Sequence, residues 1–172
     1  MQENSQIRLY RGSVLDVPAD AIVNAANETL LGGGGVDGAI HRAAGPRLLE
    51  ECRTLNGCET GRCKITKAYD ITWAKYIVHA VGPRVTDAGA PEKLRGCYVG
   101  ALQLAADNGC HSVAFPCIST GVYGVPIDLA AKTALAAIAD WLKAHPAHPM
   151  TVTLCCYREE EYRVYKELLP AD

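Results

Sequence analysis

Two polar side chains, one on each side of a glycine run, offer the clearest chemistry in this sequence. Asn27 precedes four consecutive glycines at residues 32–35, and Asp37 follows them. An asparagine amide donates and accepts hydrogen bonds, which suits the vicinal hydroxyls of a ribose, and a carboxylate ten residues later can orient a water molecule. The pair is therefore a candidate for binding a sugar and directing water to it. The alternative is that Asp37 only interacts with a helix N-terminus, worth about 0.3 to 1 kcal/mol.

The glycine run joins an apolar strand, at residues 21–23, to a predicted helix that begins at Val36. Glycine takes positive φ and lets a ligand approach the backbone, so successive N–H groups can converge on an anion. The helix adds its unpaired first-turn N–H groups and the positive end of its dipole. A flexible linker, the common alternative, does not fit between a strand and a helix. The expected phosphate-binding residues are Gly33, Gly34, Gly35 and Val36.

A second loop of similar character runs from Pro116 to Pro126, between a predicted strand and a predicted helix. Ligands of parallel sheets bind beyond the carboxyl ends of the strands, and both loops belong to that edge. An ordinary turn between a strand and a helix is the alternative for this segment taken alone. Its central residues are Ser119, Thr120, Gly121, Val122 and Tyr123.

The spacing of apolar residues predicts the elements that position these loops. The predicted strands lie at 7–10, 21–24, 64–69, 76–81, 112–116 and 151–155. The predicted helices lie at 36–44, 46–54, 92–107, 128–143 and 159–168. Strands and helices alternate in the second half, which requires right-handed crossovers and a sheet covered on both faces. We predict an α/β fold: a three-layer α/β/α domain with a mostly parallel mixed central sheet.

Length and charge narrow the class of protein. At 172 residues we expect one domain, residues 1–172, with a flexible N-terminal tail at 1–6. The net charge is −2, and the 17 basic and 19 acidic residues are interspersed, which argues against binding of duplex nucleic acid. No secretory core and no run near the ~20 apolar residues of a membrane span occur. We therefore expect a cytoplasmic monomer that does not bind membranes.

The eight cysteines are expected to be reduced and buried. The nearest group, Cys52, Cys58 and Cys63, has neither C-x-x-C spacing nor a histidine at a zinc-finger offset. The sequence therefore predicts no metal site. His79, inside the apolar run 76–81, is expected to be a packed core histidine and not a ligand.

The motifs together resemble the macrodomain family, in particular its MacroD-type members. Asn-Ala-Ala-Asn stands at 24–27, the glycine loop with Val-Asp-Gly at 32–38, and His-Arg-Ala-Ala-Gly-Pro at 41–46. Ile-Ser-Thr-Gly-Val-Tyr-Gly, at 118–124, is similar to the family's second ligand loop. The other elements also follow the family's order, so the resemblance covers nearly the whole chain.

The resemblance implies a site for ADP-ribose. Backbone N–H groups of residues 119–122 would hold the pyrophosphate, Tyr123 would pack over the distal ribose, and Tyr157 would lie against the adenine. An exposed loop tyrosine is the alternative for Tyr157. Asn24 and the backbone of Val14 complete the expected substrate-binding set.

One position departs from the family's pattern. Where the family typically has Gly-Asp-Ile-Thr, with an aspartate that accepts from the adenine amino group, this chain has serine at position 13 in Gly-Ser-Val-Leu. The hydroxyl of Ser13 can accept a hydrogen bond, but without charge assistance, which roughly halves its strength. Asp16, three residues later, would be a substitute if the loop bends back.

The same resemblance implies a reaction. Asn27 would hold the distal ribose, and Asp37 would assist attack of water on an ester that joins this ribose to an acyl group or an acidic side chain. A helix N-terminus favours the ionised carboxylate, so we expect a lowered pKa for Asp37 and a role in positioning water. The substrate's own pyrophosphate would help to take the proton.

The implied function is a hydrolase that needs no metal and no cofactor. It would deacetylate O-acetyl-ADP-ribose and remove mono-ADP-ribose from aspartate or glutamate side chains of proteins. The alternatives are an ADP-ribose reader without turnover and a binder of single-stranded nucleic acid. The slightly negative net charge and the absence of an aromatic stacking platform count against binding of single-stranded nucleic acid.

Overall fold

The computed structural model of the chain describes residues 5–169. Its strands are β1 (Gln6–Arg11), β2 (Ala21–Ala26), β3 (Cys63–Lys67), β4 (Tyr76–Val81), β5 (Ser112–Phe115) and β6 (Thr151–Cys156). Its α-helices are α1 (Gly35–Ala44), α2 (Pro46–Thr54), α3 (Ala90–Asp107), α4 (Ile127–Ala144) and α5 (Glu159–Leu168). A short 3₁₀ helix, η1 (Val14–Asp16), follows β1. Every predicted strand and helix is present, with ends shifted by a few residues.

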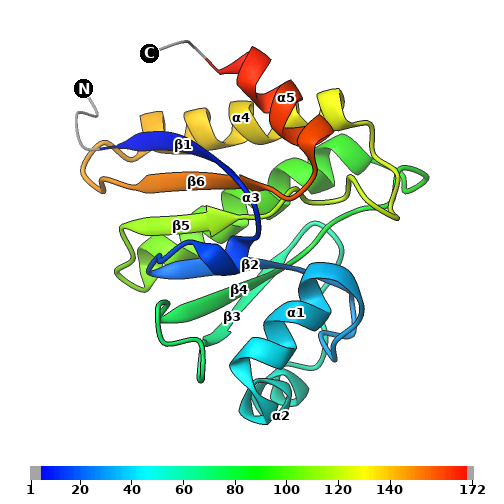
Figure 1. Cartoon of the computed structure of the whole chain (residues 1–172), viewed down its shortest axis with the longest axis vertical. Helices are drawn as coiled ribbons and strands as arrows, with labels where there is room; N and C mark the ends of the chain where they lie inside the picture. The colour runs from blue at the N-terminus through cyan, green and yellow to red at the C-terminus, as the bar shows by residue number, and fades with distance from the viewer. Residues whose placement is uncertain (1–4, 170–172) are drawn as a thin grey trace.

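The strands form one sheet in the order β1-β6-β5-β2-β4-β3. Only the β3–β4 pair is antiparallel; the other neighbours run parallel. Helices α1 and α2 cover one face of the sheet, and α3, α4 and α5 cover the other (Figure 1). The prediction of a three-layer domain with a mostly parallel mixed sheet is confirmed.

Successive side chains of a strand point to opposite faces of the sheet, which gives one hydrophobic core on each face. In β2, Ala21 and Val23 pack with α3 and α4, whereas Ile22 packs with α1 and α2. The polar residue at position 24 falls on the same face as Ile22 and is completely buried. His79 of β4 is also completely buried, as predicted.

Two boundaries differ from expectation for physical reasons. β2 continues to Ala26 because its pairing with β4 extends through Ala26 and Val81. Residues 1–4 of the predicted tail lie outside the described residues, but residues 5 and 6 are not a free tail. The backbone N–H of Met150 donates to the Ser5 hydroxyl, and the Gln6 N–H donates to the Met150 carbonyl, each at a distance of 3.2 Å. These two hydrogen bonds hold the segment against the start of β6.

The loops expected to bind ligand follow β2 and β5, which are neighbours in the sheet. The chain leaves β2 toward α1 on one face and leaves β5 toward α4 on the other (Figure 1). This is a topological switch point, where the diverging loops open a crevice beyond the carboxyl ends of the strands. No helix between residues 5 and 169 is long and apolar enough to cross a membrane.

All eight cysteines are free thiols. Six are buried, as expected, while Cys63 and Cys117 are partly exposed. Burial raises the pKa of Cys52 to about 11 and that of Cys155 to about 12, so neither thiol is a ready nucleophile. Within the described part of the chain, no group of three or more potential ligands is arranged to hold a metal ion.

Candidate active site

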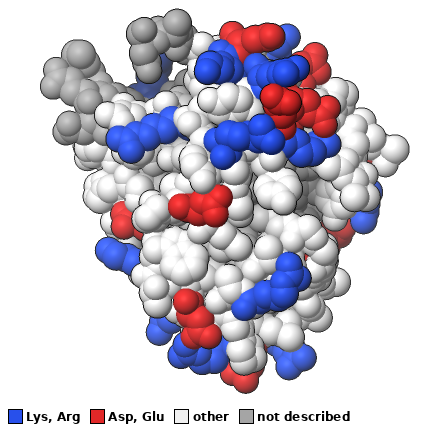
Figure 2. Space-filling view, in the orientation of Figure 1, with Lys and Arg blue, Asp and Glu red and all other residues white. Residues whose placement is uncertain are grey.

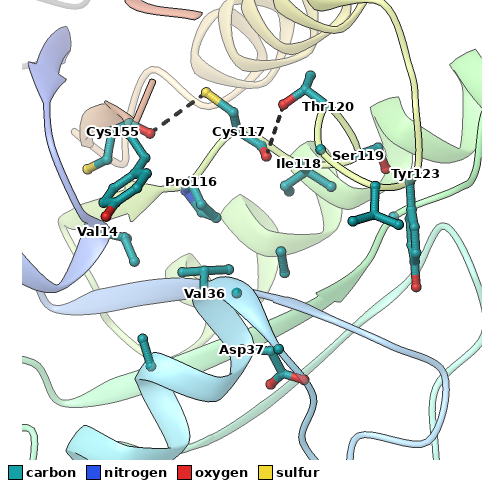
Figure 3. Close-up of a pocket in the computed structure, with 18 of the residues that line it drawn as sticks. Val14, Val36, Asp37, Pro116, Cys117, Ile118, Ser119, Thr120, Tyr123 and Cys155 are labelled. Carbon is teal, nitrogen blue, oxygen red and sulfur yellow. Dashed lines mark hydrogen bonds between the residues drawn. The ribbon is translucent and has the colours of Figure 1, made fainter. Parts of the chain in front are cut away.

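A cavity of about 710 Å³ lies at the switch point, a volume typical of sites for small ligands. Its walls come from the segments after β1, β2, β5 and β6 and from the start of α1. Figure 3 shows Asp37 on α1 across from Ser119 and Tyr123 of the β5–α4 loop, with Val14 and Cys155 at the other end. Of the residues predicted from the sequence, these line the cavity: Ser13, Val14, Asn27, Gly33, Gly34, Gly35, Val36, Asp37, Ser119, Thr120, Gly121, Val122, Tyr123 and Tyr157.

The glycine loop is shaped by backbone geometry that only glycine adopts easily. Gly32 and Gly35 have φ values of 95° and 59°. At Gly38 an added Cβ would lie 2.6 Å from the carbonyl oxygen of Gly33, so this glycine allows the loop to fold onto α1. Among residues 5–169, no side chain caps the N-terminus of α1. Its first N–H groups are therefore free to meet an anion from the cavity.

The β5–α4 loop offers a second row of backbone donors. Its turn is closed by hydrogen bonds from Val125 N to the Ser119 carbonyl and from Gly124 N to the Gly121 carbonyl, both 3.0 Å. None of the described residues accepts a hydrogen bond from the N–H groups of 119–123. Ser119 has a φ of 68°, a strained value of the kind found at ligand clamps. Both loops thus line the same cavity, and the N–H groups at 33–36 and 119–123 have no hydrogen-bond partner among residues 5–169.

Tyr123 and Val122, at the outer part of this loop, are placed differently. The side chain of Val122 is fully exposed, so its contribution to the wall is its backbone. Tyr123 stacks against the guanidinium of Arg84, which lies 4.9 Å from the ring centroid. The Tyr123 carbonyl also accepts from the N–H of Val85 at 2.8 Å. These contacts hold the tyrosine ring at the cavity end nearest Asp37 (Figure 3).

Asn27 and Asp37 converge on a single point beside Gly33. A Cβ built on Gly33 would lie 3.2 Å from Oδ2 of Asp37 and 3.4 Å from Nδ2 of Asn27. The Asn27 amide is itself fixed, because it donates to the Gly32 carbonyl (3.0 Å) and accepts from the Thr29 N–H (3.1 Å). The absence of a side chain at residue 33 leaves room for a small group, such as a water molecule or a ribose hydroxyl, between the pair.

The environment of Asp37 differs from the sequence prediction. Asp37 is only 4% exposed, and burial raises the pKa of its carboxyl group, although a hydrogen bond from Asn24 and the charge of His41 oppose that rise. The expectation of a lowered pKa is wrong because desolvation outweighs the favourable contacts. A raised pKa makes Asp37 a better proton acceptor than a surface carboxylate.

Asn24, predicted to bind substrate, does not line the cavity. It is completely buried beneath Asp37, and its Nδ2 donates to Oδ1 of Asp37 over 2.8 Å. The same Nδ2 lies 3.1 Å from Nδ1 of His79. Burial, together with the smaller effect of the His41 charge, lowers the pKa of His79 to about 3, so this imidazole is neutral. The structure thus places Asn24 behind the site and in contact with Asp37.

The other end of the cavity has a different construction. Ser13 is the N-cap of η1, and its hydroxyl accepts from the Leu15 N–H at 3.1 Å. Asp16, considered as a substitute for the family's aspartate, lies outside the cavity wall; it accepts from Ser13 N (3.1 Å) and from the Tyr10 hydroxyl (3.0 Å). Tyr157 is 75% exposed and lines the edge of the cavity.

The sequence analysis missed His41, which lies beside Asp37 outside the cavity wall, and several residues that do line the cavity. His41 Nε2 lies 3.4 Å from Oδ1 of Asp37, and the i,i+4 spacing on one helix face could have revealed it. Glu161 is buried and accepts from the Thr120 hydroxyl (2.5 Å) and from Arg158 (2.9 Å). Nothing in the acidic start of α5 distinguishes Glu161 from its neighbours. Further lining residues without a prediction are Gly12, Ala25, Ala26, Ala39, Arg42, Gly82, Pro116, Cys117, Ile118 and Cys155.

Figure 2 shows acidic and basic side chains next to one another on the face that it presents. The expectation that the chain does not bind duplex nucleic acid stays a prediction.

Comparison with known proteins decides the family. The family model described as "Macro domain" matches residues 23–134, which include both ligand loops. The chain belongs to the macrodomain family. A macrodomain of Trypanosoma brucei, solved in complex with ADP-ribose, has a TM-score of 0.90 to this chain at 49% identity, covering 96% of this chain and 69% of that one.

Two curated relatives extend this result. The protein named ADP-ribose glycohydrolase MACROD1 of Bos taurus is 48% identical over 172 residues, covering 98% of this macrodomain and 53% of the relative. A macro domain-containing protein of Methanosarcina mazei is 51% identical over 166 residues, covering 95% of this chain and 88% of the relative. The chain therefore spans about half the length of the MACROD1 relative.

Proposed function

We propose that this macrodomain is a hydrolase of ADP-ribose esters. Its substrates would be O-acetyl-ADP-ribose and proteins that carry mono-ADP-ribose on aspartate or glutamate side chains. The observation that carries the proposal is the convergence of Asn27 and Asp37 beside Gly33, at one end of a cavity with two rows of free backbone N–H groups. The name of the MACROD1 relative and the ADP-ribose in the Trypanosoma brucei macrodomain support the same substrate class.

In this proposal the ligand lies along the cavity. The N–H groups of the glycine loop and of residues 119–122 would hold the pyrophosphate between them, in a cavity that Arg42 and Arg158 also line. The adenine would extend toward Val14 and Tyr157, and the distal ribose toward Asn27 and Asp37. This orientation places the ester next to the carboxylate.

Hydrolysis would then proceed with Asp37 directing water. Oδ2 of Asp37 accepts a hydrogen bond from the water, whose oxygen attacks the acyl carbon. The new C–O bond forms, the bond between the acyl carbon and the ribose oxygen breaks, and that oxygen leaves as a hydroxyl with the proton that the water loses. The raised pKa of Asp37 suits it to carry this proton, with the pyrophosphate as a second acceptor. The chain needs no metal for these steps.

The decisive assay is release of ADP-ribose from an acceptor protein that is automodified on glutamate. Wild-type protein should release ADP-ribose and should also deacetylate O-acetyl-ADP-ribose. Binding of ADP-ribose near the micromolar range, about −8 kcal/mol, without any release would assign a reader function instead. If the folded protein did not bind ADP-ribose at millimolar concentration, both the hydrolase function and the reader function would be excluded. The cytoplasmic location and monomeric state stay proposals, to be tested by cell fractionation and by light scattering.

A further inference from the structure

A line of buried polar side chains runs beneath Asp37, within the layer between the sheet and α1 and α2. Asn24 of β2, His79 of β4 and Thr66 of β3 come from three neighbouring strands, and each is at most 2% exposed. Asn24 and His79 are direct partners in the strand register. Their neighbours on this face, such as Ile22, are apolar. Polar groups in an apolar layer are costly unless they bond to one another, so this line is a defined network.

Hydrogen-bond chemistry fixes the direction of the network. The Thr66 hydroxyl donates to the carbonyl of Lys67 (3.0 Å), so it is an acceptor toward Nε2 of His79, 2.9 Å away. His79 therefore carries its proton on Nε2, and its Nδ1 accepts from Nδ2 of Asn24 (3.1 Å). The same amide group donates to Oδ1 of Asp37 (2.8 Å).

The orientation of the Asn24 amide depends on these contacts. Reversal of the amide would direct its oxygen at two acceptors, the Asp37 carboxylate and Nδ1 of His79. In the orientation present, Oδ1 of Asn24 is buried and has no hydrogen-bond partner among residues 5–169. The fold thus tolerates an unpaired carbonyl in order to direct the NH₂ group at Asp37.

Asn24 is the main anchor of Asp37. Across the described residues, its hydrogen bond is the only one that the Asp37 carboxylate accepts from a side chain. His41 Nε2 lies 3.4 Å from Oδ1 but forms no hydrogen bond. With Oδ1 held from below, Oδ2 is the oxygen that faces the space beside Gly33, next to Nδ2 of Asn27.

We propose that His79 is a positioning residue for the reaction: through Asn24 it holds Oδ1 of Asp37 so that Oδ2 meets the water. This inference rests on the proposed hydrolase function. It assigns to a buried histidine, which touches no part of the cavity, control over the rate of a step that takes place in it. Binding of ADP-ribose does not depend on this network, because the pyrophosphate is held by backbone N–H groups.

Two substitutions of His79 distinguish the hydrogen bond at Nδ1 from the hydrogen bond at Nε2. In His79→Asn the side-chain oxygen takes the place of Nδ1, so the bond from Asn24 is kept and the bond to Thr66 is lost. In His79→Gln the amide nitrogen takes the place of Nε2, so the bond to Thr66 is kept and the bond from Asn24 is lost. Each variant loses one buried hydrogen bond and part of the ring volume, which makes them matched controls for stability.

The expected result is a difference in kcat. His79→Gln should lower kcat on O-acetyl-ADP-ribose by about tenfold or more, since small misplacement of a reacting group has effects of this size, while His79→Asn stays within about threefold of wild type. The Kd of ADP-ribose should change less than about threefold in both. Equal losses of kcat in the two folded variants, or no loss in either, would overturn the proposal.

A measurement on the unmodified protein covers the case in which the variants do not fold or the protein shows no turnover. The ¹⁵N chemical shifts of the His79 ring report which nitrogen carries the proton. The proposal requires the neutral ring with Nε2 protonated and an Asn24 side-chain NH₂ signal that shifts when Asp37 is replaced by Ala. A proton on Nδ1 would overturn it. An inactive protein with the required signals would instead contradict the proposed function and leave the network intact.

Discussion

The two ends of the cavity are held in place by different means. Where Asn27 and Asp37 meet, the carboxylate rests on a buried network that crosses three strands. At the other end, Ser13 is fixed by the turn that it caps, and Tyr157 is largely exposed. The core of the fold fixes the geometry of the Asp37 end, whereas a local turn and exposure to solvent characterise the Ser13 end.

This difference indicates which end of the cavity tolerates amino-acid substitution. A buried, interlocked end keeps its geometry and is sensitive to single atoms, as catalysis requires. A surface turn can change residue without disturbing the core, and this is the end at which the chain departs from the family's pattern. Substitutions should therefore affect turnover strongly at the Asp37 end and affinity weakly at the Ser13 end.

The largest effect is expected for Asp37→Ala. On the proposed function, removal of the Asp37 carboxylate should lower turnover on an ADP-ribose ester by about 100-fold or more, whereas the Kd of ADP-ribose should change little because the proposed pyrophosphate contacts are backbone N–H groups. Steady-state kinetics and calorimetry measure the two quantities. Near-normal turnover in this variant would show that the buried end is not the catalytic one.

A methyl group between the two polar side chains should have the next largest effect. In Gly33→Ala the new Cβ would lie 3.2 Å from Asp37 Oδ2 and fill the space for water, so we expect a loss of about tenfold in kcat. Gly34→Ala is the comparison in the same loop, because an added Cβ there meets no protein atom within 4 Å. Any effect at Gly34 should appear in KM. Equal kcat losses in both would point to the loop backbone instead.

The buried network should also make stability depend on pH. His79 titrates at its ordinary value of 6.5 in the unfolded chain but at about 3 in the folded chain. Between these values unfolding takes up a proton, so the free energy of unfolding falls as pH falls, by up to about 1.4 kcal/mol per pH unit from this group. Denaturant unfolding of wild type and His79→Asn from pH 7 to pH 4 measures the difference.

Other groups around His79 also affect the free energy of unfolding. They are present in both wild type and His79→Asn, so their contributions cancel in the difference. They are Asp37 and His41 of α1, Cys52 of α2 and Thr66 of β3. Asp37 has the opposite sign: its raised pKa favours the folded state as pH falls. Parallel stability curves for the two proteins would mean that His79 takes up its proton over the same pH range in the folded and unfolded states.

The smallest effect is expected at the base end. With no carboxylate at position 13, the adenine amino group adds little, and an inosine analogue of ADP-ribose should lose less than about 1 kcal/mol of binding. Ser13→Asp keeps an oxygen for the Leu15 N–H and adds one for the amino group, so it should tighten ADP-ribose by a similar amount but not the analogue. Four dissociation constants test this. A large loss with inosine in the unmodified protein would reveal another acceptor at the amino group.

The sequence alone determined the order of the elements, the layers and the two loops that form much of the cavity wall. Local patterns were sufficient for this, because strand alternation, glycine loops and helix starts are properties of consecutive residues. The loops after β2 and β5 meet at the switch point by the general geometry of parallel sheets. Asn27, Asp37 and the residues at 119–123 were therefore placed correctly in the wall from motifs alone.

Only the tertiary structure decided the state of Asp37 and the place of Asn24. The helix N-terminus predicts a lowered pKa, but burial by residues distant in sequence raises it. Asn24 shares a motif with Asn27, yet the strand continues through residue 24 and alternation turns its side chain inward, toward His79 on the neighbouring strand. Burial and cross-strand contacts depend on how segments far apart in the chain pack together, and no local pattern contains that information.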